Sequence, residues 1–246
     1  MHCFDLPEFN VVIAGGGSIG RALLEEVQLI PGFNQAIVLE RNPDPSGNAS
    51  SVLHLKMDAK DPDSIKDAAA QAARHVNRVH LLINTVGVLH DGKLRPEKSL
   101  KAISQDSLLN SFAINAAFLP LLAQAFSAMM RHDDPAILAS LSARVGSIED
   151  NHSGGWYSYR AAKAAQNMLL RTLAREWRLS HPKATVLALH PGTVESRLSE
   201  PFISANYRKR VLTPGECATS LIKVMASLNV SDSGSFHDWK GEVIPW

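Results

Sequence analysis

Residues 11–27 read VVIAGGGSIGRALLEEV, and this segment indicates how the chain is organised. An apolar run leads into a GxGxxG spacing, and a segment of helical period follows from Arg21. Gly15 permits a tight turn, Gly17 lets a ligand approach the backbone, and Gly20 lets helix and strand pack closely. The helix amino terminus adds amide donors that suit a pyrophosphate, although a glycine-rich turn without a ligand is an alternative. The predicted dinucleotide-binding turn comprises Gly15, Gly17, Ser18, Ile19 and Gly20.

An acidic residue, Glu40, ends the second apolar run, twenty positions after Gly20. Dinucleotide-binding folds place a carboxylate there to bind the ribose 2′-hydroxyl. A carboxylate at that place disfavours the 2′-phosphate of NADP, so we expect a modest preference for NAD. Arg41 could instead accept the 2′-phosphate, and Glu40 could be a solvated strand end. Both cofactors therefore stay open.

Short apolar runs alternate with segments of helical period along the chain, as in β-α units around a parallel sheet. Expected strands cover residues 11–14, 36–40, 52–57, 79–84, 136–140 and 185–190; expected helices cover residues 21–30, 62–75, 104–130, 157–179 and 214–228. Pro120 should kink or divide the third helix. We predict one α/β domain over residues 1–246, with long loops at 86–103 and 192–212 on the edge where such sheets bind ligands.

The composition argues against several classes of function. Lys and Arg number 25 against 24 Asp and Glu, so no excess charge draws the chain to nucleic acid or to a membrane surface. The sequence has no apolar leader and no run of 18 uncharged apolar residues, which favours a soluble, cytoplasmic protein. Two cysteines, without CxxC, HxxxH or HExxH spacing, predict a reducing compartment and no metal site.

Tyr159 and Lys163 form a YxxxK pair, the spacing that puts two side chains on one face of a helix. A phenol is a poor proton donor or base at neutral pH. A nearby ammonium favours the phenolate and should lower the pKa of the tyrosine towards the working range. The pair alone decides little, because chance supplies this spacing fairly often.

Seven motifs occur in a fixed order: GGGSIG at 15–20, Asp58, NTVG at 84–87, Asn115, LSARVGS at 141–147, YRAAK at 159–163 and HPGTV at 190–194. In this order and spacing the chain resembles the short-chain dehydrogenase/reductase family over essentially its whole length. Residues 141–167 are similar to the branch of C-factor-like proteins and sniffer-type carbonyl reductases, and GEVIPW at 241–246 resembles the C-factor-like members. The resemblance implies a doubly wound Rossmann fold of about seven parallel strands that holds NAD or NADP.

The resemblance also implies residue roles. Tyr159 would be the acid/base, Lys163 would bind the nicotinamide ribose and lower the tyrosine pKa, and Asn115 would hold a water of the proton relay. The implied contacts of the cofactor are Asp58 with the adenine, Asn84 and Gly87 with the ribose, and Pro191, Gly192 and Val194 with the carboxamide side of the nicotinamide.

The implied activity is hydride transfer between a nicotinamide dinucleotide and a small carbonyl or alcohol. Trp156, Leu198 and Phe202 in the loops suggest an apolar substrate. Family members pair through the helices that correspond to 104–130 and 157–179, so we expect a homodimer or homotetramer. The C-factor resemblance keeps an alternative open, namely a dinucleotide-binding signalling or regulatory protein with weak or no turnover.

One departure from the family pattern concerns the catalytic serine. Ungapped alignment of LSARVGS makes Ser142 the first of the family's paired serines and puts Ala143 where the catalytic second serine belongs. An alanine cannot donate a hydrogen bond to the substrate oxygen. Ser142 is the adjacent hydroxyl and the expected replacement, but it would have to leave regular strand geometry, because successive strand residues face opposite ways. Ser147 reaching in, or a slow enzyme without a donor, are the other outcomes.

Overall fold

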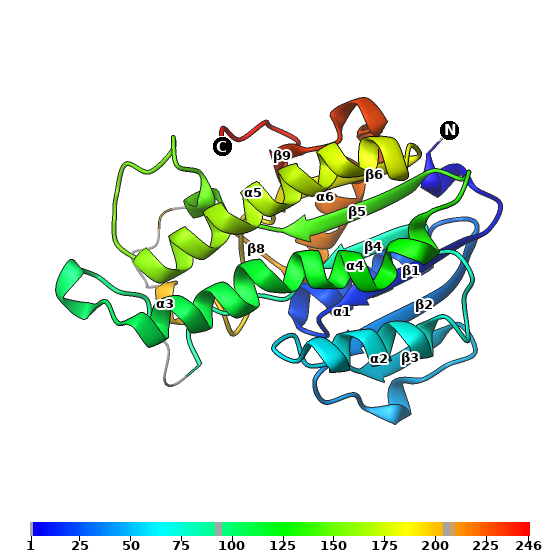
Figure 1. Cartoon of the computed structure of the whole chain (residues 1–246), viewed down its shortest axis with the longest axis horizontal. Helices are drawn as coiled ribbons and strands as arrows, with labels where there is room; N and C mark the ends of the chain where they lie inside the picture. Colours follow the sequence, from blue (N-terminus) through cyan, green and yellow to red (C-terminus); the bar gives the residue numbers. More distant parts are fainter. Residues whose placement is uncertain (1, 92–94, 204–207, 209) are drawn as a thin grey trace.

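The computed structural model describes residues 2–91, 95–203, 208 and 210–246, and its centre is one parallel sheet (Figure 1). The strands, in spatial order, are β3 (Val52–Lys56), β2 (Phe33–Glu40), β1 (Phe9–Ala14), β4 (Leu81–Asn84), β5 (Ala136–Leu141), β6 (Ala184–His190) and β9 (Ser235–Asp238). Every pair of neighbours is parallel. The order reverses between β1 and β4, which is the topological switch point of a doubly wound sheet. The predicted fold class is confirmed.

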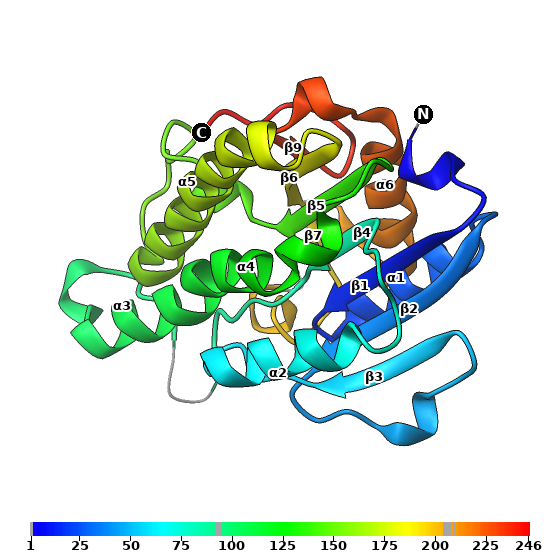
Figure 2. The same cartoon turned by 45° about the vertical axis from the view of Figure 1, so that its right-hand side comes forward.

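Helices cover both faces of the sheet (Figure 2). Val12 and Ala14 of β1 pack with α2 (Pro62–Ala72), α4 (Phe118–Met130) and α5 (Tyr157–Ser180). Val11 and Ile13 point to the other face, where α1 (Ser18–Gln28) and α6 (Pro214–Ser227) pack. Because both faces of the sheet are covered, every residue of β1 is buried, and its residues 11–14 are apolar at successive rather than alternate positions.

The helix expected at 104–130 is a continuous helical run with a wide turn in its middle. It consists of α3 (Gln105–Phe112), a π-helical segment (Ala113–Ala117) and α4. Pro120 cannot donate to the carbonyl of Ala116, and its ring crowds that carbonyl, so the wide turn takes up the mismatch without a break. By length and composition this run, Gln105–Met130, could span a membrane, but the large apolar side chains of α4 lie in the core between helix and sheet.

The remaining differences from the expected elements have local causes. The helix expected from residue 21 already begins at Ser18, inside the glycine-rich turn. Strand β9 has only four residues, two of them His237 and Asp238, so no apolar run marks it. A short parallel pair, β7 (Thr193–Val194) and β8 (Val211–Leu212), joins the two ends of the second long loop. Within the two loops, residues 92–94, 204–207 and 209 lie outside the described part of the chain.

Candidate active site

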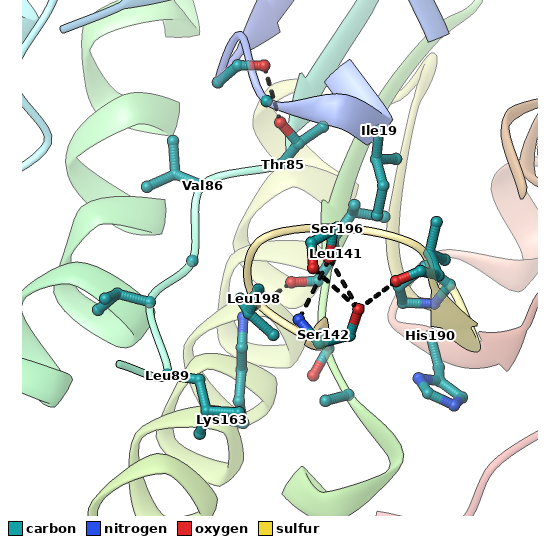
Figure 3. A pocket seen from close by; sticks show the side chains of 18 of the residues that line it. Ile19, Thr85, Val86, Leu89, Leu141, Ser142, Lys163, His190, Ser196 and Leu198 are labelled. Carbon is teal, nitrogen blue, oxygen red and sulfur yellow. Dashed lines mark hydrogen bonds between the residues drawn. The ribbon is translucent and has the colours of Figure 1, made fainter. Parts of the chain in front are cut away.

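A cleft of about 1800 Å³ runs along the carboxyl edge of the sheet. Its walls come from the glycine-rich turn, the loops after β4 and β6, the end of β5 and the first turns of α5. Figure 3 shows Ile19 of that turn, Val86 after β4, Lys163 of α5 and Leu198 of the β6 loop around one space. The switch point of the sheet and the predicted site therefore coincide.

The glycine-rich turn is shaped by close backbone contacts. Gly15 has a φ of +110°, which an L side chain rarely adopts, and a Cβ at Gly20 would overlap the carbonyl oxygen of Gly15. The Thr85 hydroxyl lies 3.0 Å from the carbonyl oxygens of both Ala14 and Gly15 and ties the turn to the end of β4. A Cβ at Gly17 would meet nothing within 4 Å, so the space in front of the helix amino terminus is open.

Glu40 lies at the expected place, beside the glycine-rich turn, and has a partner that the sequence did not reveal. His54 Nδ1 donates to Glu40 Oε1 at 2.6 Å from the neighbouring strand β3. The other carboxylate oxygen, Oε2, fills the position that a Cβ at Gly16 would need. Arg41 is exposed and lines the cleft. The pair Glu40–His54 therefore fixes one carboxylate oxygen and leaves the other towards the turn.

Asn84 is placed differently from the role implied by the resemblance. Its side chain is buried and bonds within the protein, donating to Ser140 Oγ at 3.0 Å and accepting from the Val86 amide at 3.0 Å. It does not line the cleft, whereas Gly87 and the half-buried Asp58 do. Asn84 thus joins the ends of β4 and β5, and a contact with the cofactor ribose stays a prediction for it.

Asn115 sits in the π-helical turn, where the extra residue per turn places its amide against the loop after β4. Its Oδ1 accepts from the Val88 amide and its Nδ2 donates to the Val88 carbonyl, both at 2.8 Å. A Cβ at Gly87 would lie 3.4 Å from Asn115 Oδ1 and 3.7 Å from Lys163 Nζ. The Asn115 amide, the Gly87 backbone and the Lys163 ammonium therefore converge, and the relay role of Asn115 stays a prediction.

The structure brings Tyr159 and Lys163 together on the buried face of α5. Lys163 Nζ lies 5.8 Å from the centroid of the Tyr159 ring and donates to the Leu141 carbonyl at 2.9 Å and to Gln166 Oε1 at 2.8 Å. Two of its three donors are therefore used. Burial lowers the pKa of Lys163 to about 7.

The expected lowering of the Tyr159 pKa is wrong in direction. Burial raises the pKa of this phenol above its ordinary value. The cause is burial: the charged phenolate would lose its water at this site, which favours the protonated phenol. Tyr159 consequently keeps its proton at neutral pH.

The hydroxyl of Ser142 points into the protein. Ser142 continues the pairing of β5 with β6 through its amide, which donates to the Leu189 carbonyl, and its Oγ donates to Asn167 Oδ1 of α5 at 2.6 Å. Ala143 is extended, so its methyl group faces the opposite way. Ser147 is buried and accepts from the Asp150 amide instead of reaching the cleft. Ser142 as donor to the substrate stays a prediction that requires its hydroxyl to leave Asn167.

The loop after β6 covers the far side of the cleft. Gly192 has a φ of +79°, and a Cβ there would meet the indole of Trp239 at 2.8 Å. Val194 is fixed by its pairing with Leu212 and by the Ser199 hydroxyl, which donates to its carbonyl. Pro191, Gly192 and Val194 all line the cleft, as their expected place beside the nicotinamide requires.

The structure also brings together three potential metal ligands that the sequence did not suggest, His80, His132 and Asp134. They lie where β4 and β5 begin, at the edge opposite the cleft. His80 Nδ1 accepts from the Asn10 amide, so the neutral ring carries its proton on Nε2, which faces Asp134 at 3.7 Å. Arg78 also binds Asp134 at 2.6 Å. A metal would need the Nε2 lone pair, so this cluster has the polarity of an ion-pair network.

Comparisons with known proteins agree with this geometry. The family model described as short chain dehydrogenase matches residues 10–206. The NADPH-bound carbonyl reductase from chicken fatty liver is 26% identical, with a TM-score of 0.85 over 98% of this chain and 100% of that one. The C-signal protein of Myxococcus xanthus is 29% identical over 149 residues, which are 60% of this chain and 84% of that protein.

A third relative, the 1-hydroxy-2-glutathionyl-2-methyl-3-butene dehydrogenase of Rhodococcus sp. (strain AD45), is 37% identical over 114 residues. That match spans 46% of this chain and 48% of the relative, about half of each. The resemblance to C-factor-like proteins and carbonyl reductases is confirmed. Because the family model covers both the glycine-rich turn and the Tyr159–Lys163 pair, the chain belongs to the short-chain dehydrogenase family, whose members are NAD(P)-dependent oxidoreductases.

Proposed function

We propose that the protein transfers a hydride between NAD(H) or NADP(H) and a small carbonyl or alcohol substrate. The observation that carries this proposal is the meeting of the glycine-rich turn and the Tyr159–Lys163 pair along one cleft. The dinucleotide, when bound, supplies the hydride for carbonyl reduction. Tyr159, protonated at neutral pH because of its burial, would give its proton to the carbonyl oxygen and would regain it in alcohol oxidation.

The donor set of the cleft fits a dinucleotide. The open space before Gly17 and the uncapped amides of α1 suit a pyrophosphate, and one donor of the Lys163 ammonium is left for a ribose hydroxyl. The residues that would hold the cofactor are Gly15, Gly17, Ser18, Ile19, Gly20, Glu40, Arg41, Asp58, Gly87, Lys163, Pro191, Gly192 and Val194.

For the choice of cofactor we propose a modest preference for NAD. Glu40 is held beside the glycine-rich turn, and its carboxylate would repel a 2′-phosphate. Arg41 next to it and His54 on its oxygen both reduce that repulsion, and the chicken carbonyl reductase is bound to NADPH, so the preference should be small.

An apolar substrate is supported by the side chains near Tyr159. The Trp156 ring lies edge-on to Tyr159 with centroids 6.3 Å apart and tilts against Phe202 with centroids 4.9 Å apart. Leu198 and Ile203 also line the cleft. These side chains form an apolar wall beside the Tyr159 ring.

A homo-oligomer is supported by exposed apolar side chains on the two helices that the family uses for pairing. Leu109 and Phe112 of α3 are 59% and 46% exposed, and Met168 of α5 is 66% exposed. The two helices lie side by side (Figures 1 and 2). Light scattering of the purified protein should therefore give at least twice the chain mass of 26.7 kDa, and Met168→Glu should lower it.

The test of the proposed function combines binding with turnover. NADH and NADPH fluorescence is titrated against the protein, and a panel of apolar ketones and aldehydes is assayed. Tyr159→Phe removes only the reacting hydroxyl, so cofactor binding should persist while turnover falls about 10²–10⁴-fold. Absence of saturable cofactor binding would contradict the proposal. Binding without turnover would favour the signalling alternative, which none of the comparisons supports.

A further inference from the structure

Glu97 is a buried carboxylate that the proposed hydride transfer does not use. Its residue is 3% exposed, although it belongs to the long loop after β4. Within the described part of the chain, its polar contacts are with the start of α5, and its side-chain partner Ser158 lies 61 positions further along. Desolvation of a carboxylate is costly unless hydrogen bonds replace the lost water, so the burial of Glu97 requires hydrogen-bond donors around it.

The backbone carbonyl and the side-chain carboxylate of Glu97 both accept hydrogen bonds from the start of α5. Its backbone carbonyl accepts from the Trp156 amide at 2.6 Å. Its Oε2 accepts from the Ser158 amide at 3.1 Å, and its Oε1 accepts from the Ser158 hydroxyl. Helix amino termini normally find such an acceptor in the residue that precedes them. Trp156 occupies that position in α5 and makes no side-chain cap, so Glu97 supplies the cap from another segment.

The backbone that leads into α5 adopts an unusual conformation. Gly154, Gly155 and Trp156 have φ values of +63°, +67° and +54°, and Trp156 is the one non-glycine residue with positive φ in the described part of the chain. Such a conformation persists in a bulky residue only where its surroundings hold it. The bond from the Trp156 amide to Glu97 is the hydrogen bond that ties this conformation to the loop after β4, beside the ring contacts of Trp156 with Tyr159 and Phe202.

The start of α5, which Glu97 caps, carries the proposed proton donor Tyr159. Tyr159 follows Ser158 directly, and the Trp156 ring stands edge-on to the Tyr159 ring. Burial is the cause of the raised pKa of Tyr159, and no charged neighbour contributes to it. The side-chain bonds of Glu97 end on Ser158, the residue before Tyr159, so Glu97 acts on the position of Tyr159.

We propose that Glu97 is a positioning residue for Tyr159: it caps α5 from the long loop after β4 and so fixes the direction of the Tyr159 hydroxyl and of the Trp156 ring. The proposal rests on the proposed function, in which Tyr159 transfers the proton. It also couples the long loop after β4, whose first residues line the cleft, to the helix that carries Tyr159, since Glu97 belongs to the loop and binds the start of the helix.

Four variants test the proposal in the full-length protein. Glu97→Ala removes both carboxylate bonds, Glu97→Gln keeps one acceptor oxygen, and Ser158→Ala removes the hydroxyl contact alone. Glu176→Gln is the matched control, an exposed acid on the same helix. For each variant we would measure kcat, the substrate KM, the cofactor Kd and hydrogen exchange of the Ser158 amide.

Glu97→Ala should lower kcat about 10- to 100-fold, because a small displacement of a reacting group has effects of that size. The cofactor Kd should not change, since the glycine-rich turn lies at the other end of the cleft. Exchange at the Ser158 amide should become faster, and Glu97→Gln should recover most of the rate. If Glu97→Ala does not fold, Glu97→Gln and Ser158→Ala are expected to show the same effects at smaller size.

Unchanged kcat with unchanged exchange in these variants would overturn the proposal. A fall of kcat accompanied by an equal loss of cofactor binding, or shared by Glu176→Gln, would overturn it as well, because a general loss of structure would then be the cause. If the wild-type protein reduces no carbonyl, the proposed function fails, while exchange at Ser158 still decides whether Glu97 holds the start of α5.

Discussion

Helices α1 and α5 both begin at the cleft, and they differ in how their amino termini are capped. The start of α1 has Gly17 at its cap position, no side-chain cap and open space in front of it. The start of α5 is closed by the carboxylate of Glu97. Amide groups that are already bonded cannot bind an external anion, so α1 can take a phosphate and α5 cannot. The cleft therefore has two different ends. The binding end consists of the glycine-rich turn and the backbone amides at the start of α1. The chemical end consists of side chains around the start of α5, including Tyr159 and Lys163.

The largest effect in this comparison is expected on kcat at the chemical end, where Ser142 is predicted to donate a hydrogen bond to the substrate oxygen. Ser142→Ala should lower kcat about 10²–10³-fold if Ser142 turns from Asn167 to the substrate, because one lost donor has an effect of that size. Ala143→Ser should change kcat little. The measurement is kcat on the best substrate of the carbonyl panel. Full activity of Ser142→Ala together with a faster Ala143→Ser would show that position 143 is the donor position.

At the binding end, Gly17→Leu should raise the cofactor Kd at least about tenfold, or 1.4 kcal/mol. Its Cβ would meet no protein atom within 4 Å, and the new side chain would occupy the open space before α1 and so displace a phosphate. The thermal midpoint should stay near that of wild type. Gly20→Ala is the contrasting variant, because its Cβ would overlap the Gly15 carbonyl and lower stability as well. Equal effects of the two variants on stability would contradict the distinction.

The buried ammonium of the chemical end should make stability depend on pH. Burial lowers the pKa of Lys163 from 10.5 to about 7, so between these values the unfolded chain binds more protons than the folded one. The stability contribution of this group therefore rises with pH from about 7 to 10.5 and is smallest below 7. Urea unfolding at pH 7 and pH 9 should show that the free energy of unfolding of the wild type, relative to that of Lys163→Met, is larger at pH 9. A constant difference between the two proteins would refute this.

The smallest expected effect concerns the choice between NAD and NADP. His54→Leu frees Glu40 Oε1 and leaves its charge without a partner, so NADPH binding should weaken relative to NADH by about two- to fivefold. His54→Gln keeps a neutral donor and should stay close to wild type. The measurement is the ratio of the two dissociation constants in one buffer. If NADPH binding becomes tighter relative to NADH in His54→Leu, Glu40 does not face the ribose 2′-position of the cofactor.

Side chains whose role depends on sequence-distant partners were the ones that sequence reasoning missed or misplaced. Thr85, His54 and Glu97 each bind a segment that is far away in the chain. No spacing rule connects Glu97 with Ser158, because they lie 61 positions apart with α3, α4 and β5 between them. Asn84 belongs to a recognisable motif, but its bond to Ser140 depends on the pairing of β4 with β5, which brings the ends of the two strands together.

The sequence by itself determined the alternation of strands and helices, the place of the glycine-rich turn and the shared face of Tyr159 and Lys163. These features depend on neighbours within a few residues, where steric and periodic rules act. The tertiary structure alone decided the raised pKa of Tyr159, the partner of Ser142 and the cap of α5. Burial and hydrogen bonding between distant segments set these properties, and neither exists until the sheet and its helices have packed.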